Sequence, residues 1–284
     1  MSAGGVSRIL LVVDGGPASE AASAVAAALA KACGASLTAL AAGERTLVPT
    51  EAEGGIPVET VFAGAETDFV SEVVRRAKNE IDLVVVGSSS SAGRFRGALS
   101  LRLWELARSI PTPVLLVPEG SGAELKQILL CTGGELYIHH GILFTAALAS
   151  ALGAEVTVLH VLPERPGLYR SLSPPAVSPA GFLAGENHLA RQLRAQMAAL
   201  EKLNVSASLV IEEGLAERTI LEAARRLDAR MIVVGSSPAR GVLGASILGN
   251  VTREIASRSS VPVLVVRSNP RGLLRDLWRI LRDG

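Results

Sequence analysis

The chain has few aromatic side chains and almost no cysteine. Aromatic residues make up 3% of its 284 residues, so the core must be built from alanine, valine, leucine and isoleucine. That composition suits close packing of helices on a sheet better than an aromatic-lined ligand cage. Cys33 and Cys131 are the only cysteines, too few for a disulfide framework or a zinc cluster, which indicates a reducing compartment. We expect both to be small buried side chains.

A large net charge and long apolar runs are also missing. The formal net charge is +1, which removes any global electrostatic argument for binding nucleic acid. No stretch of about 18 uninterrupted apolar residues occurs, so no membrane-spanning helix is expected. The first residues lack the basic start and the long apolar run of a signal peptide. These absences predict a cytoplasmic protein.

What the chain does contain is an internal repeat. The apolar run 8–13 ends in a turn at Asp14, and the run 127–132 ends in a turn at Gly133, 119 residues later. Such runs without alternation are typical of strands covered on both faces. Each is followed by a helix candidate, a closing glycine and a further strand candidate (18–33, Gly34 and 35–40; 138–152, Gly153 and 154–159). Glycine directly after a helix supplies the left-handed cap conformation at low cost.

A second block repeats with a larger offset. Gly87 and Gly235 are 148 residues apart, in the segments LVVVGSS and MIVVGSS. The other matching segments are strand candidates at 58–62 and 208–211, helix candidates at 66–80 and 215–228, and last strands at 112–117 and 261–266. The offset grows because the second copy has about thirty more residues between its second and third strands, in a Pro/Ser-rich loop (163–181) and a helical stretch (186–203). The first copy has only a short connection, 42–57, in that place.

Strands that alternate with helices predict right-handed crossovers and a parallel sheet. We therefore predict an α/β protein of two tandem domains, 1–120 and 126–268, each a five-stranded parallel sheet flanked by helices. Each half has enough apolar residues to bury a core of its own. The last strands, 113–117 and 262–266, are expected to meet edge to edge and hide each other's backbone groups, which would make the chain an internal pseudo-dimer.

Residues 269–284 are predicted to form an amphipathic C-terminal helix. Apolar residues fall on one helical stripe and arginines on another (Leu274, Leu277, Trp278 and Leu281; Arg271, Arg275, Arg279 and Arg282). Such a helix packs onto its own domain or onto a homodimer mate, the interpretation we favour, or it lies weakly on an anionic membrane surface.

The order of these segments resembles the universal stress protein family. The likeness is carried by the Gly-rich turn after the first strand, the strand-helix segment 214–228, the segment VVGSS through LGNVT (233–252) and the closing VPVLVVR (261–267). It covers nearly the whole second copy and the first copy less fully. It implies a Rossmann-like or flavodoxin-like sheet of the adenine nucleotide alpha hydrolase-like type, dimerisation through the last strand, and ATP binding in some members but not in others.

ATP-binding members of that family have Gly, two residues, Gly, nine residues, then Gly-Ser or Gly-Thr after the fourth strand. Glycines let the backbone approach phosphates, and the last pair opens a helix whose free N–H groups favour anions. The second copy keeps the outer glycines but has Pro238 at the middle position and Gly133 in place of an acidic residue. The first copy keeps Asp14 but has Ser90 and Ser100 at the later glycine positions. The candidate residues of these degenerate nucleotide sites are Gly235, Ser236, Gly249, Asn250, Val251, Asp14 and Gly87.

Nothing in the sequence predicts catalysis or a metal site. No Gly-x-Ser-x-Gly elbow or ordered Ser/Asp/His set occurs. The adjacent His139 and His140 point about 100° apart on a helix and cannot chelate one metal. With no companion cysteine or carboxylate cluster, these residues, His160 and His188 are interpreted as surface or capping residues.

We therefore predict a regulatory stress-response protein that is not an enzyme, with no nucleic-acid partner and with no cofactor assigned. The alternative is an ATP-binding switch or slow ATPase that acts through the second domain, with ATP as its cofactor. A third hypothesis is a scaffold that associates with a membrane transporter through the C-terminal segment and the loop 163–185.

Overall fold

The computed structural model describes most of both halves of the chain. The described residues are 5–13, 15–41, 51–52, 56–62, 69–79, 81–88, 107, 110, 112–133, 139–164, 179–236 and 250–267. The predicted C-terminal helix at 269–284 and most of the loop 163–181 lie outside them. Among the residues that the structure describes, no helix combines the length and the apolar character needed to cross a bilayer.

The first half follows the predicted order of strands and helices. Its elements are β1 (Arg8–Val13), α1 (Ser19–Cys33), β2 (Ser36–Ala41), β3 (Glu51–Ala52), β4 (Ile56–Phe62), α2 (Phe69–Asn79), β5 (Leu83–Ser88) and β6 (Val114–Pro118). Helix α1 ends as its sequence predicts, because Gly34 adopts a left-handed φ of 63° and its N–H caps the last turn. The two-residue strand β3 lies in the connection 42–57, for which the sequence predicted no strand.

The second half repeats this order and adds two helices. Its elements are β7 (Gln127–Thr132), α4 (His139–Leu152), β8 (Glu155–Leu162), α5 (Pro179–Leu183), α6 (His188–Lys202), β9 (Ala207–Glu213), α7 (Ala216–Arg226), β10 (Met231–Ser236), α8 (Asn250–Arg258) and β11 (Val263–Arg267). Helix α6 is the predicted helix of the insertion. It begins after Asn187, whose side-chain oxygen accepts a 2.7 Å hydrogen bond from the N–H of Ala190.

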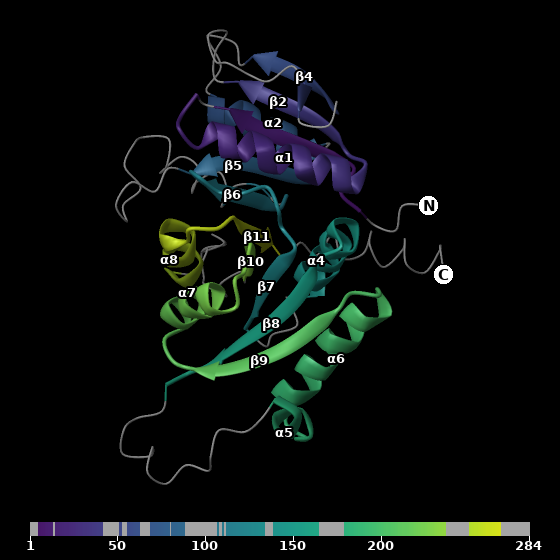
Figure 1. The fold of residues 1–284 in the computed structure, drawn as a ribbon, viewed down its shortest axis with the longest axis vertical. Coiled ribbons are helices and arrows are strands. Elements are labelled where there is room, and N and C mark those ends of the chain that lie inside the picture. Colours follow the sequence, from purple (N-terminus) through teal and green to yellow (C-terminus); the bar gives the residue numbers. More distant parts are fainter. Residues whose placement is uncertain are drawn as a thin grey trace.

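The strands of both halves form one sheet in the order β3-β4-β2-β1-β5-β6-β11-β10-β7-β8-β9. Within each half the five parallel strands run third, second, first, fourth, fifth, which is the Rossmann order rather than the flavodoxin order. The strands of the two halves are not interleaved: Figure 1 shows the first half above and the second half below, with β6 and β11 between them. The predicted α/β fold with two Rossmann-like units is confirmed.

The two halves are joined by their last strands. Strand β6 pairs antiparallel with β11, with Leu116 opposite Val263 and Val114 opposite Val265. This is the edge-to-edge contact that the sequence predicted. Because each of these strands also has a parallel neighbour in its own half, neither leaves an unpaired backbone edge.

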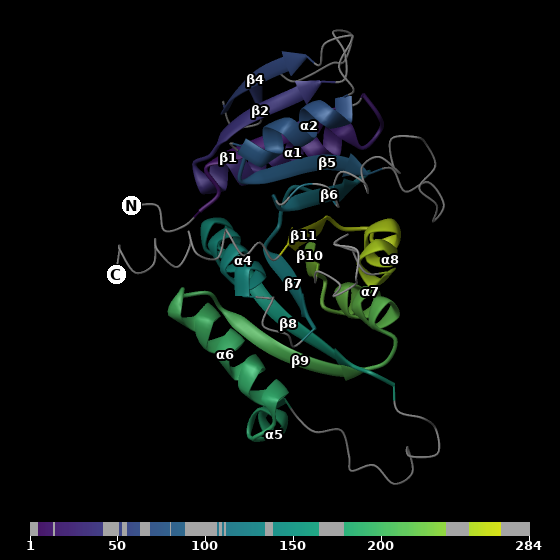
Figure 2. The ribbon, with the colours of Figure 1, turned by 180° about the vertical axis from the view of Figure 1, so that it is seen from behind.

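The hydrophobic core consists of two clusters, one on each face of the sheet, and each cluster contains residues of both halves. The expectation that each half has a core of its own is therefore wrong. One cluster contains residues of α1, α4 and α6, including Leu29 and Ile142, and the other contains residues of α2, α7 and α8. Figure 1 shows α4 and α6 opposite α7 and α8, and Figure 2 brings α2 to the front. Each cluster crosses the β6–β11 junction, because helices of both halves cover the same continuous sheet.

The two cysteines lie in this interior. Cys131 is buried and Cys33 is half-buried. Burial raises the pKa of the Cys33 thiol to about 11 and raises the pKa of Cys131 well above its usual range. Both side chains therefore remain protonated at neutral pH and act as small apolar groups.

Candidate functional site

In each half the predicted nucleotide cleft lies at the carboxyl ends of the parallel strands, where the strand order reverses. Because β6 and β11 pair antiparallel, these ends lie at opposite edges of the joined sheet. In the first half this point lies between β1 and β5, and in the second half between β7 and β10. Ligands of open parallel sheets bind at such a point. Val86 is paired with Val12, and Val234 with Cys131. Gly87 and Gly235 therefore lie next to the ends of the first strands, as the sequence predicts.

Gly87 is required by packing inside the first half. A Cβ at this position would lie 2.8 Å from both the carbonyl carbon and the carbonyl oxygen of Ala18, the residue before α1. Such distances are shorter than van der Waals contact, so any side chain here would push β5 away from the β1–α1 turn. The close approach that the sequence assigned to a phosphate is made by the protein's own backbone.

In the second half, the end of β10 is more open. Gly235 is exposed, and the strand continues through Ser236. Helix α8 begins at Asn250, and Val251 in its first turn is 37% exposed. The free N–H groups of a helix start can bind an anion. The exposed Gly235 and the start of α8 thus both lie at the carboxyl ends of the parallel strands of the second half.

Two of the candidate residues, Asp14 and Gly249, lie outside the described residues, as do the loops 89–106 and 237–249. Nothing in the structure tests whether these residues contact a ligand. The assignment of the seven candidates to nucleotide sites therefore stays a prediction.

Gly133 takes the place of the acidic residue in the second half. A Cβ built on it would meet no atom within 4 Å, and its φ is not positive. No steric conflict therefore requires a glycine at this position, because the backbone has room for a side chain. An acidic side chain would therefore fit at position 133.

His160 is a feature of this edge that the sequence interpretation missed. The interpretation of all four histidines as surface or capping residues is wrong here, because His160 is 5% exposed. Its Nδ1 lies 2.8 Å from the carbonyl oxygen of Thr132, the paired residue on β7. A carbonyl can only accept, so Nδ1 carries a proton and donates it. The sequence placed this histidine at the end of a strand. In the structure β8 continues to Leu162, so that His160 lies inside the strand.

The buried His160 is expected to make stability depend on pH. Burial lowers the pKa of this histidine below its ordinary 6.5, and the bond to Thr132 offsets this only in part. Between the native and unfolded pKa values the unfolded chain binds more protons, so stability falls as pH drops below about 6.5. Urea unfolding at about pH 7.5 and pH 5.5 measures this loss. The variant His160→Asn should lose less between these pH values, and an equal loss would contradict the assignment.

No group of three or more histidine, cysteine, aspartate or glutamate side chains that could bind a metal occurs in the described part of the chain. In the second half, the described part of this edge contains the start of helix α8 and the buried His160.

Comparison with known proteins places this architecture in a family. The model of the universal stress protein family matches residues 124–267. The universal stress protein E homolog of Haemophilus influenzae is 25% identical over 225 residues, which cover 74% of this chain and 69% of that protein.

Solved structures agree over nearly the whole length. A functionally unknown protein of Pseudomonas aeruginosa PAO1 aligns with a TM-score of 0.65 and 20% identity, covering 96% of this chain and 97% of that one. A universal stress protein of Archaeoglobus fulgidus aligns with a TM-score of 0.62 and 15% identity, over 93% and 97%. At these identities the structures support the fold alone. The family model covers half of the sequence, and the chain therefore belongs to the universal stress protein family, which supports a role in the stress response.

Proposed function

We propose that this chain is a regulatory, non-catalytic stress-response protein with degenerate nucleotide clefts. The observation that carries the proposal is Gly87, because close packing against the backbone of Ala18 accounts for this glycine without a phosphate. The second cleft has a glycine at position 133 where the family pattern places an acidic residue. In this proposal the two halves, joined through β6 and β11, act as an internal pseudo-dimer.

This proposal predicts that the full-length chain binds adenine nucleotide weakly or not at all. Protein purified without added ligand should release no nucleotide on denaturation, and millimolar ATP with magnesium should not raise its melting temperature. Nucleotide recovered from the purified protein, or ATP hydrolysis above background that Gly249→Val abolishes, would contradict the proposal.

The second candidate function is an ATP-binding switch that acts through the second half. It is favoured by the exposed Gly235 at the end of β10 and by the helix start at Asn250. The empty space at Gly133 gives a direct test. The variant Gly133→Asp restores the acidic position and is expected to strengthen ATP binding roughly tenfold, as one hydrogen bond to a charged group would.

The matched control is Gly133→Asn, which has nearly the same shape without the charge. If Asp strengthens ATP binding and Asn does not, the second cleft retains the geometry of a nucleotide site. If neither variant binds ATP at millimolar concentration, the cleft has lost that geometry, and the switch hypothesis is wrong.

A further inference from the structure

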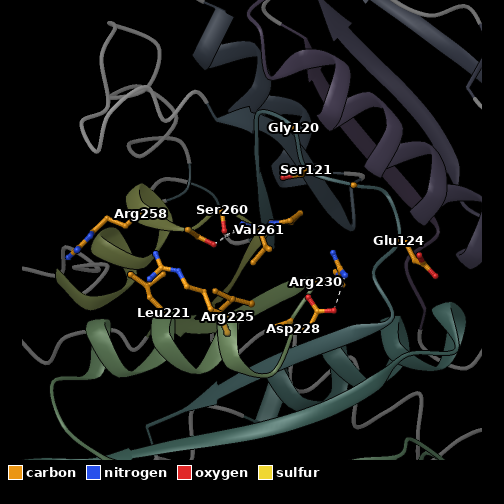
Figure 3. Close-up of a pocket in the computed structure, with 16 residues that line it drawn as sticks. Gly120, Ser121, Glu124, Leu221, Arg225, Asp228, Arg230, Arg258, Ser260 and Val261 are labelled. Carbon is orange, nitrogen blue, oxygen red and sulfur yellow. Dashed lines mark hydrogen bonds and ion pairs between the residues drawn. The ribbon is translucent and has the colours of Figure 1, made fainter.

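A cavity lies at the amino ends of the parallel strands of the second half. Its volume is about 570 Å³, within the range of small-molecule sites. It is formed by the linker between the halves (residues 120–124), the last turns of α7 and α8, and the segments that lead into β10 and β11. Figure 3 shows Arg225 and Arg258 on the side of α7 and α8, and the Arg230–Asp228 pair nearer the linker.

The charges around this cavity do not cancel. Asp228 accepts a 2.8 Å bond from Arg230, and Glu124 lies 3.4 Å from Lys126, so each lining carboxylate already has a cation. Arg225 and Arg258 have no ion pair and no side-chain hydrogen bond with any residue in the described ranges. Among the described residues, these two guanidinium groups at the cavity therefore have no counter-charge.

A hydroxyl group at the cavity is also without a partner. The Oγ of Ser121, in the linker, is buried and makes no hydrogen bond. Ser259 differs, because its Oγ donates to the carbonyl oxygen of Val261 and accepts from its N–H. A buried hydroxyl that loses its water without gaining a partner is unfavourable. Ser121 lies across the cavity from Arg258 (Figure 3), whereas Ser259 fixes the turn before β11.

Arginines at helix C-termini often serve to neutralise the helix dipole. At the end of α7 the chain's own N–H groups already meet the last carbonyls: Leu227, Asp228 and Ala229 donate to the carbonyl oxygens of Ala223, Arg225 and Ala224. The Arg225 guanidinium is therefore not needed as a cap and remains available to a ligand.

The first half provides an internal comparison. The N–H of Asp82 donates to the carbonyl of Arg8, as the N–H of Arg230 donates to that of Gln127, which makes Asp82 and Arg230 equivalent positions 148 residues apart. The same offset places Ala77, which is 2% exposed, where the second half has Arg225. The Arg225 side chain is therefore specific to the second half and is not a requirement of the repeated fold.

We propose that this cavity binds a small, multiply charged oxyanion through Arg225 and Arg258. The shared chemistry of such a ligand is phosphate or carboxylate oxygen, which the planar guanidinium binds in a fork of two N–H groups. The two arginines belong to α7 and α8. The ligand would thus connect the last turns of α7 and α8 in the second half.

Isothermal titration of the full-length chain at low ionic strength tests this site, with inorganic pyrophosphate and citrate as separate probes. One equivalent of at least one probe is expected to bind. Arg225→Gln and Arg258→Gln should each weaken that binding roughly tenfold, because each removes a charge-assisted contact. The control is Arg226→Gln, which removes the same charge one residue away, where the arginine pairs with Glu212 outside the cavity.

Three results would overturn the proposal. The first is no binding of either probe at millimolar concentration. The second is binding that Arg225→Gln and Arg226→Gln weaken equally, which would indicate a general charge effect. The third is binding that survives both cavity variants but is lost in Gly249→Val, which would place the anion at the nucleotide cleft instead. Arg225 is exposed, so its glutamine variant is expected to fold, and circular dichroism checks this.

Discussion

Replacing Val265 with proline is expected to reduce the free energy of unfolding by roughly 3 kcal/mol or more, because a proline inside a sheet removes a ladder bond and leaves its acceptor unpaired. Strand β11 lies between β10 and β6. The carbonyl oxygen of Pro262 accepts a hydrogen bond from the N–H of Ile232 on β10. Because backbone groups alternate in direction along a strand, the N–H of Val265 points towards β6. There it is opposite Val114, and the lost bond joins the two halves.

Two controls separate this effect from simpler ones. Val265→Ala keeps the N–H and loses only apolar contacts, at a cost of about 1.5–2.5 kcal/mol. Ile211→Pro places a proline on β9, the last strand of the sheet order. The carbonyl oxygen of Ser206 accepts a hydrogen bond from the N–H of Val156 on β8. By the same alternation the N–H of Ile211 points away from β8, and a proline is tolerated better at such an edge position.

Urea unfolding monitored by circular dichroism ranks the three variants. Val265→Pro should have the lowest midpoint, and its transition should become broader or split if one half unfolds before the other. If Val265→Pro is as stable as Val265→Ala, the β6–β11 ladder does not hold the halves together, and the continuous sheet contributes little to stability.

The sequence predicted the elements that have a regular pattern. Apolar runs located the strands, and Gly34 and Gly153 marked the helix ends, where both residues have left-handed φ angles of 63° and 60°. The resemblance to the family also implied which strands meet, namely the last strands, whose pairing hides the backbone edge of each. These features depend on local propensity and on repetition, and both can be recognised in the amino-acid sequence alone.

The features that the sequence did not predict depend on distant residues. The strand β3 has only two residues and is stabilised by its antiparallel pairing with β4. Two residues are too few to show the hydrophobic periodicity by which a strand is recognised in a sequence. The division of the core by sheet face follows from the continuity of the sheet. The oxyanion cavity gathers Ser121, Arg225 and Arg258 from three segments, and only the folded chain brings them together.

Gly87 shows a different limit of prediction from sequence, because two different physical causes can each require a glycine at this position. A phosphate close to the backbone and a neighbouring backbone close to the strand both exclude a side chain. The sequence interpretation chose the phosphate, whereas the structure shows Ala18 at 2.8 Å from the position of a Cβ. The composition of the segment is the same in both cases, so only the distance distinguishes them.

Gly87→Ala is therefore expected to destabilise the protein by roughly 2–3 kcal/mol, the cost of forcing an extra methyl group into a packed interior. The contact is with backbone atoms of Ala18, which cannot move aside as a flexible side chain could. Gly87→Val should be worse, because its branched side chain needs still more room. The matched control is Gly133→Ala at the equivalent edge of the second half, where nothing lies within 4 Å.

The control is expected to be neutral or slightly stabilising, because alanine lowers the entropy of the unfolded chain where the native backbone accepts it. Thermal and urea unfolding of both alanine variants measure the difference, and ATP titration of the same samples separates packing from ligand binding. If Gly87→Ala is as stable as the wild type but binds ATP more weakly, the glycine serves a phosphate. A loss of stability without any change in ATP binding instead assigns Gly87 to the packing of β5 against the start of α1.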